Sequence, residues 1–142
     1  MALHQASMTK VLADLAGADS QSSLAVVQNV YAALATGSVD AMGEYLADDV
    51  ELELHDSSGM MSGNWKGRDT VLAAITANFA KVDQQKPQIK GMTADGNTVA
   101  VLMSETGVVK ESRRAYTANG VQWFTIAAGR LQRIEEIIIL EF

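Results

Sequence analysis

The chain has no cysteine, one proline and only two histidines among its 142 residues. Without cysteine it can form no disulfide, no thiolate metal site and no cysteine nucleophile. The same absence fits a cytoplasmic protein, because thiol pairs are used for stability mainly in oxidising compartments. Two histidines are a poor basis for a metal centre. The sequence therefore predicts neither a metal nor any other cofactor.

Positive charge is also scarce, with 11 lysines and arginines against 17 acidic residues and a net charge of -6. Such a molecule repels nucleic-acid phosphates and anionic lipid, and the pair Arg113 and Arg114 is too small to reverse that field. No apolar run approaches the roughly 20 residues needed to span a bilayer. The N-terminal residues also lack the pattern of a secretory signal. We expect no nucleic-acid partner and no membrane partner.

The high hydrophobic content and the length of the chain indicate one globular domain. Hydrophobic residues make up 48% of the chain, and its length suits a single core, so we assign residues 1–142 to one domain. Residues 1–20 form an N-terminal extension, which could be an extra amphipathic helix that packs on the body. Its apolar side chains would be Leu3, Met8, Val11, Leu12 and Leu15.

Helical periodicity occupies the first part of the chain and predicts three helices. In the first, apolar residues recur at helical spacing after a group of serines, and Gly37 is a suitable stop. Ser38 can cap a shorter second helix, and Asp69 begins a third that Pro87 prevents from continuing. The serines that offer caps to the first helix are Ser20, Ser22 and Ser23, and the turn after the second is at Asp48 and Asp49.

The second part of the chain has the period of two that marks strands. The alternation already begins in residues 50–54, and after Pro87 the remainder predicts strands joined by turns at residues 94–97, 111–112 and 128–129. The last strand, 131–142, is apolar on both faces from Ile137 to Leu140. It must be covered by helices on one side, and a second subunit is the expected cover on the other. The pattern is α+β.

Four segments resemble the SnoaL-like branch of the nuclear transport factor 2-like superfamily, which includes ketosteroid isomerases, polyketide cyclases and limonene epoxide hydrolases. They are VVQNVYAALATGSVDAMGEYLADDV, WKGRDTVLAAI, GNTVAVLMSETG and WFTIAAGRLQRIEE. Their order and spacing carry the resemblance. It implies a cone-shaped, curved antiparallel sheet wrapped around three N-terminal helices, with an apolar cavity between them.

The residues that ketosteroid isomerases use for catalysis are missing. The family's helix tyrosine, acidic base and second acid correspond to Val30, Leu54 and Gln122 here. That isomerisation needs a carboxylate base and an oxyanion hole built from a phenol and a neutral acid. Tyr31 lies one residue from the expected tyrosine, about 100° around the helix. We interpret it as a core or dimer tyrosine, and ketosteroid isomerase activity is not expected.

The limonene epoxide hydrolase pattern is also incomplete. The resemblance places Glu105 and Glu136 at its two acidic positions, but the intervening arginine becomes Met103, and the tyrosine and asparagine of the first strand become Leu52 and Leu54. In SnoaL-like cyclases one aspartate, at the position of Glu136, serves as both acid and base. Only that minimal arrangement is retained.

Glu136 is the strongest candidate on physical grounds. Alternation places it beside Ile134 and Ile138 on one face of the last strand. Burial there would raise its pKa, and Glu105 would raise it further if both acids faced the cavity. The alternative is that Glu135 or Glu136 is solvated or paired with an arginine across the sheet. The arginines available are Arg113, Arg114 and Arg133.

His55 is the other titratable group near the first strand. Alternation puts it with Glu51 and Glu53 on the side opposite Leu52 and Leu54, so a surface histidine is the better interpretation. The spacing Glu-x-Glu-x-His matches no recognised metal geometry. The sequence assigns no role to His55.

These observations lead to a small-molecule binding protein with an apolar cavity. If it is an enzyme, it is a proton-transfer isomerase or cyclase acting on a cyclic or polyketide-like carbonyl compound, with Glu136 as the acid/base and Glu105 as its modulator. The alternatives are a non-catalytic ligand-binding or assembly module and a degenerate epoxide hydrolase. The expected partners are a small apolar or cyclic ligand and a second copy in a homodimer. The expected ligand-binding residues are Val30, Leu54, Trp65, Met103, Tyr116, Gln122, Phe124 and Ile138.

Overall fold

The computed structural model describes residues 2–142, with side chains from Asp19 onward. Within these residues, two α-helices, one 3₁₀ helix and six strands make up the α+β pattern that the sequence predicts. Among the described residues, no helix is long and apolar enough to cross a membrane. The elements are α1 Ala2–Ala35, η1 Asp40–Tyr45, β1 Leu46–Asp56, β2 Gly63–Lys66, α2 Arg68–Phe79, β3 Val82–Asp95, β4 Thr98–Val109, β5 Ala115–Ala127 and β6 Arg130–Glu141.

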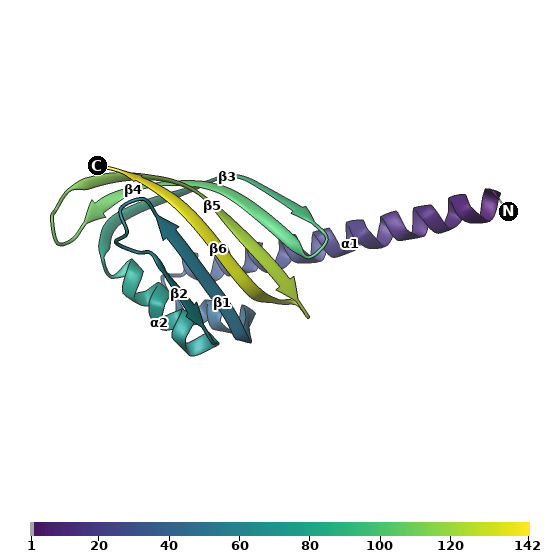
Figure 1. Cartoon of the computed structure of the whole chain (residues 1–142), viewed down its shortest axis with the longest axis horizontal. Helices are drawn as coiled ribbons and strands as arrows, with labels where there is room; N and C mark the ends of the chain where they lie inside the picture. Colours follow the sequence, from purple (N-terminus) through teal and green to yellow (C-terminus); the bar gives the residue numbers. More distant parts are fainter. Residues whose placement is uncertain (1) are drawn as a thin grey trace.

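The strands form one curved, unclosed sheet in the order β2-β1-β6-β5-β4-β3, and both α-helices lie under its concave side (Figure 1). The predicted fold class is confirmed. The sheet is mixed rather than antiparallel throughout, because β1 and β6 pair in parallel while the other neighbours are antiparallel. Alternation along a strand reveals its faces but not its neighbours, so the parallel pair was not visible in the sequence.

Helix α1 does not begin at the serines, and the prediction of caps there is wrong. The Ser20 hydroxyl accepts a hydrogen bond from the Gly96 amide at 2.9 Å, and the Ser23 hydroxyl donates one to the Gly96 carbonyl at 2.8 Å. These bonds fasten the helix to the turn between β3 and β4. The helix runs unbroken from Ala2, and its first part extends beyond the sheet (Figure 1). The side chains expected to pack that extension lie outside the described ones: Leu3, Met8, Val11, Leu12 and Leu15.

The end of α1 is as predicted, whereas the second helix differs. Gly37 has a φ of +86° and its amide donates to Leu34 O at 3.0 Å, a conformation that favours glycine. Ser38 does not cap the second helix. Instead, η1 is preceded by Val39, which makes no side-chain cap hydrogen bond. The chain then enters β1 at Leu46, earlier than the alternation indicated, because the register is irregular between Leu46 and Glu51.

Pro87 lies inside β3 rather than ahead of the sheet. Helix α2 already ends at Phe79, and β3 begins at Val82. The expectation that strands start only after Pro87 is therefore wrong. Because β3 is an edge strand, the missing N–H of Pro87 costs no ladder bond to a further strand. The turn predicted at residues 128–129 is confirmed, with positive φ at Ala128 and Gly129.

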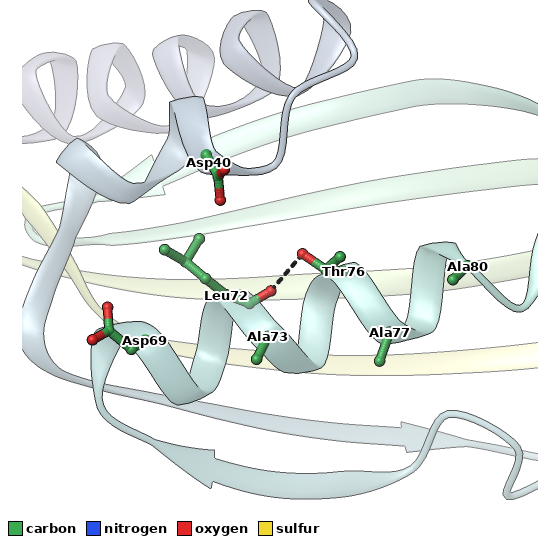
Figure 2. Close-up of a pocket in the computed structure, with 7 residues that line it drawn as sticks. All are labelled: Asp40, Asp69, Leu72, Ala73, Thr76, Ala77 and Ala80. Atoms are coloured by element: carbon green, nitrogen blue, oxygen red, sulfur yellow. Dashed lines mark hydrogen bonds between the residues drawn. The ribbon is translucent and has the colours of Figure 1, made fainter.

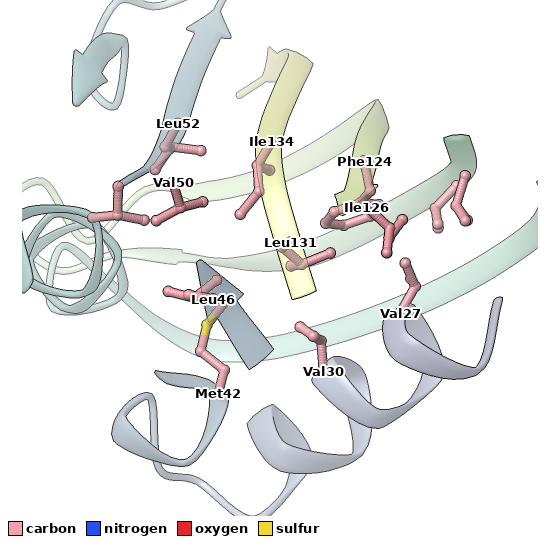
Figure 3. Close-up of a cluster of buried hydrophobic side chains, with 13 residues drawn as sticks. Val27, Val30, Met42, Leu46, Val50, Leu52, Phe124, Ile126, Leu131 and Ile134 are labelled. Atoms are coloured by element: carbon pink, nitrogen blue, oxygen red, sulfur yellow. The ribbon is translucent and has the colours of Figure 1, made fainter. Parts of the chain in front are cut away.

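The core consists of two apolar clusters on the concave side of the sheet. In the main cluster, Val27 and Val30 of α1 pack towards Leu131 and Ile126 (Figure 3). Burying each such side chain contributes roughly 1.5–3 kcal/mol. The second cluster lies towards the other end of the sheet and comprises Leu54, Val82, Val109, Tyr116, Ala118, Ile138 and Leu140. The boundary between the clusters positions the candidate site.

Candidate functional site

A row of polar and small residues separates the two apolar clusters. On β6, Ile134 belongs to the main cluster and Ile138 to the second, and Glu136 lies between them on the same face. The register pairs Glu136 with Leu54 of β1 and with Gln122 of β5. The next row on this face has Gly120 and Met103 as partners. The inner face is therefore apolar at both ends and polar in the middle. We call the paired residues Glu136 and Gln122, which lie between the two clusters, the polar row.

Seven of the site residues predicted from the sequence lie on this inner face. Alternation along paired strands fixes the assignment, since partners in register share a face. Glu105 pairs with Ala118, and Ala118 pairs with the buried Leu140, so Glu105 is on the same side as Glu136. The seven are Leu54, Met103, Glu105, Gln122, Phe124, Glu136 and Ile138.

Tyr31, Gln122 and Glu136 form one hydrogen-bonded chain. The Tyr31 hydroxyl donates to Gln122 Oε1. The amide nitrogen of the same side chain, Nε2, donates to Glu136 Oε2 at 3.0 Å. Tyr31 also meets Phe124 edge to face, with ring centroids 6.2 Å apart, which fixes the phenol over the sheet. The chain joins the helix layer to the carboxyl group on β6.

Glu136 is held where ionisation is unfavourable. Burial raises the pKa of its carboxyl, the hydrogen bond from Gln122 opposes the rise, and the charge of Glu105 adds to it. The residue is nevertheless only half-buried by surface accessibility, whereas the neighbouring Ile134 and Ile138 are 4% and 7% exposed. The Glu136 carboxyl thus combines a mainly protein environment with some accessible surface.

Glu105 has partners of its own. Tyr116 Oη donates to Glu105 Oε2 at 2.7 Å, and Gln85 Nε2 donates to Oε1 at 3.3 Å. The Tyr116 ring lies over Gly107, where an added Cβ would come within 2.5 Å of the phenol oxygen. Gly107 is therefore required for Tyr116 to reach the carboxylate. Burial, followed by the bond to Glu105, raises the pKa of Tyr116, so the phenol stays protonated.

Trp65 connects the two clusters. Its ring packs against both of them and lies over Gly63, where a Cβ would come within 2.3 Å of the indole. On β5, Gly120 lies beside Met103 in register and packs closely against β6, since an added Cβ would come within 2.5 Å of the Ile137 carbonyl oxygen. The large ring and this close strand contact thus flank the polar row.

The remaining predicted residues are in the clusters themselves. Val30 is in the main cluster with Phe124, and Leu54, Tyr116 and Ile138 are in the second. Tyr31, interpreted from the sequence as a core or dimer tyrosine, instead bonds to the polar row. Its phenol next to an apolar helix face was the available signal, but the partner, Gln122, is 91 residues away.

The outer face of the sheet carries a separate network of ion pairs. Arg133 binds Glu51 at 2.6 Å and Glu135 at 2.8 Å, and it also binds Glu53. Glu53 in turn contacts His55 Nε2 at 2.8 Å. The alternative of pairing with Arg133 thus applies to Glu135, while Glu136 points inward. His55 is on the surface, as predicted, with 63% of its side chain exposed.

Two surface hollows are distinct from the polar row. One, of about 500 Å³, lies along α2 beside Asp40 of η1, and its other lining residues are Asp69, Leu72, Ala73, Thr76, Ala77 and Ala80 (Figure 2). The other, of about 420 Å³, lies over β3 and β4 and includes Glu105 but not Glu136. Both are shallow and open to solvent. Neither brings together the chemically notable side chains, so we base the candidate site on the polar row.

Comparison with protein families decides the assignment. The sequence model of the family described as SnoaL-like domain matches residues 27–134, which is most of the chain. The chain belongs to the SnoaL-like family. This SnoaL-like chain has no significant match among curated proteins.

Solved structures agree on the nuclear transport factor 2-like fold. A nuclear transport factor 2-like protein from Burkholderia xenovorans has a TM-score of 0.72 at 20% identity, over 84% of this chain and 90% of its own. A candidate SnoaL-like polyketide cyclase from a Jannaschia species has a TM-score of 0.73 at 16% identity, over 84% of this chain and 86% of its own. A candidate polyketide cyclase from Xanthomonas campestris has a TM-score of 0.66 at 23% identity, over 84% of this chain and 91% of its own. At these identities the likeness establishes the fold alone.

Proposed function

We propose that this SnoaL-like protein binds a small cyclic or polyketide-like carbonyl compound between the helices and the inner face of the sheet, where Glu136 moves a proton. The observation that carries the proposal is the position of Glu136, a carboxyl with a raised pKa in the polar row between two apolar clusters. A carboxyl with a pKa nearer neutrality can both take and return a proton. Polyketide cyclases among the structural relatives support this class of substrate.

The chemistry is proton abstraction next to a carbonyl group. The Glu136 carboxylate takes the proton from the α carbon, and the electron pair of the broken C–H bond passes into the enolate. An enolate conjugated with a carbon–carbon double bond then accepts a proton at the far carbon of that system, or the enolate attacks a second carbonyl carbon to close a ring and the resulting alkoxide accepts the proton. In either case Glu136 returns its proton to the product, so no external reagent is needed. The negative charge of Glu105 modulates the proton affinity of Glu136.

Exchange at the α carbon tests this without the natural substrate. The bicyclic ketone 2-tetralone, incubated with the protein in deuterium oxide, should lose its α-proton NMR signal faster than in buffer. Glu136→Gln should remove that acceleration, for which general acid/base catalysis typically contributes about 10²–10⁴-fold. Glu135→Gln, which changes the neighbouring outer-face acid, is the matched control and should exchange like the wild type. Equal rates for Glu136→Gln and the wild type would refute the assignment.

The second candidate is a non-catalytic ligand-binding module. It is favoured by the state of Glu105, because Tyr116 and Gln85 already occupy both of its carboxylate oxygens. A second acid held in this way is not free to protonate a substrate, which also disfavours the epoxide hydrolase alternative. If 2-tetralone protects the protein against heat but shows no accelerated exchange, the binding module replaces the enzyme.

The outer face of the sheet supports a homodimer. Large apolar side chains on three adjacent strands are 40–59% exposed, and they lie next to one another in register. A contiguous patch of this kind usually marks an interface. The expected occupant is a second copy, because a two-fold contact pairs one patch with itself. The patch comprises Leu102, Val121, Trp123, Ile137 and Ile139.

Sedimentation at micromolar concentration tests the dimer. The wild type should sediment at twice the monomer mass, and Val121→Lys, at the middle of the patch, should sediment as a folded monomer. Thr117→Lys lies on the same strand and the same exposed face, four residues from Val121 and outside the patch, and it serves as the control. A monodisperse wild-type monomer would overturn this part of the proposal.

A further inference from the structure

The Gln122 side chain connects the two groups most suited to act on a ligand. Its carbonyl oxygen accepts the Tyr31 hydroxyl, and its amide nitrogen donates to Glu136. An amide has a donor end and an acceptor end, so each neighbour receives only one kind of hydrogen bond in a given orientation. The orientation in the structure suits a Glu136 Oε2 atom that carries no proton and can only accept.

Protonation of Glu136 on Oε2, the oxygen that accepts from Gln122, removes that match. This oxygen then carries an O–H that needs an acceptor, and Gln122 presents N–H on that side. Leaving a buried donor without a partner costs roughly 1–3 kcal/mol. Rotation of the amide by half a turn restores every bond, because the Glu136 O–H then donates to Oε1 and Nε2 donates to the Tyr31 oxygen. In that arrangement the Tyr31 O–H has no partner within the chain of three.

We propose that Gln122 is a positioning residue whose amide turns over when Glu136 gains a proton, which frees the Tyr31 hydroxyl to donate a hydrogen bond to a bound ligand. No covalent bond forms or breaks in this step. The ligand class rests on the proposed function, since a proton taken from the α carbon would reach Glu136 as negative charge develops on the carbonyl oxygen. A donor freed at that moment stabilises the enolate. The turnover of the amide itself needs no ligand.

The charged and titratable groups around Glu136 define what else could respond to pH. Tyr31 approaches from α1, Glu105 from β4 and Tyr116 from β5, whereas the β1 partner is the apolar Leu54. Burial, with a smaller effect from the charge of Glu136, raises the pKa of Tyr31 above its ordinary value. A change at Tyr31 near neutral pH is therefore not its own ionisation.

Carbon-13 NMR of the labelled Tyr31 Cζ and Glu136 Cδ atoms tests the inference in the ligand-free protein. We expect the two signals to shift with one common midpoint as pH changes, and both side-chain amide protons of Gln122 to shift with them. Glu136→Gln should abolish the transition at Tyr31. If the Tyr31 and Gln122 signals stay constant while Glu136 titrates in the wild type, the amide does not turn over and the inference is wrong.

Gln122→Met separates a relay from a direct electric field. Methionine has a similar length and no amide, so Glu136 should still titrate while the response of Tyr31 is lost. A Tyr31 signal that still follows Glu136 in Gln122→Met would show a field effect and overturn the inference. Glu105→Gln controls for the second acid and should leave the common midpoint shared, though moved downward.

The outcomes also separate this inference from the proposed function. Coupled titration in a protein that never accelerates exchange of 2-tetralone would support the amide turnover and refute the enzyme. Accelerated exchange that depends on Glu136, without any response at Tyr31, would support the enzyme and refute the amide turnover.

Discussion

The two faces of the sheet treat adjacent residues of β6 in opposite ways. Glu135 points outward, where Arg133 neutralises it in a partly exposed network. Glu136 points inward, where burial raises its pKa and its hydrogen-bond partner is a neutral amide. The same carboxyl group is thus a surface ion-pair member at one position and a candidate proton carrier at the next. The surroundings of each glutamate, rather than its residue type, distinguish the ion-pair member from the candidate proton carrier.

The sharpest way to test this difference uses two isoleucines of the same strand. Ile134 on the inner face is 4% exposed, and Ile137 on the outer face is 59% exposed. Ile134→Ala should reduce the free energy of unfolding by about 2–5 kcal/mol, because it leaves a cavity. Ile137→Ala in the dissociated chain should change it by no more than about 0.5 kcal/mol. Urea unfolding at low protein concentration measures both.

The close packing of β6 against Gly120 gives a second, smaller effect. A Cβ there would come within 2.5 Å of the Ile137 carbonyl oxygen, which is backbone and cannot rotate away. Gly120→Ala should therefore cost about 1–3 kcal/mol of unfolding free energy. Gly91→Ala on β3 is the control, since nothing lies within 4 Å of its added Cβ. Equal stability of the two variants would mean that β5 and β6 are less closely packed than described.

The two glutamates themselves give a pH-dependent comparison. Because the pKa of Glu136 is raised on folding, its favourable contribution is fully present below the unfolded pKa and is lost as pH rises through the folded pKa. Glu136→Gln should then match the wild type near about pH 4. It should be more stable by roughly 1–3 kcal/mol near about pH 8, where the buried charge is removed.

Glu135→Gln should behave differently. It loses an exposed ion pair with Arg133, so we expect a loss of at most about 1 kcal/mol at neutral pH that shrinks with added salt. Unfolding curves for both variants and the wild type, recorded across this pH range, make the comparison. A stabilisation of Glu135→Gln equal to that of Glu136→Gln would contradict the assignment of the two faces.

Local patterns were sufficient for much of the fold. The alternation through Leu52 and Leu54, the stop at Gly37 and the turn at residues 128–129 each depend on neighbouring residues only, and the structure agrees with them. Pairings between distant segments were not accessible in this way. Ser23 looked like a cap because its bond to Gly96 spans 73 positions, and the parallel pairing of β1 with β6 joins segments from opposite ends of the strand region.

The candidate site shows the same limit. Strand alternation brought Glu136 to the inner face, and the structure agrees. The orientation of Tyr31 depended on a rotation of one residue around a helix whose position over the sheet was unknown. Gln122 was interpreted as a replaced acid, whereas its importance comes from having a phenol on one side and a carboxyl on the other. Such a role exists only once three elements are assembled.

The unclosed sheet has a consequence for how copies of the chain can meet. An open sheet ends in a strand whose free amides and carbonyls invite a further strand, which is how edge-to-edge aggregation begins. In β3 the ladder is interrupted by two register shifts, between Asp83 and Lys86 and between Ile89 and Gly91. Pro87 lies between them and offers no N–H. Addition of a further strand at this edge is thereby disfavoured, so the homodimer proposed above would form through the convex apolar face rather than by extension of the sheet.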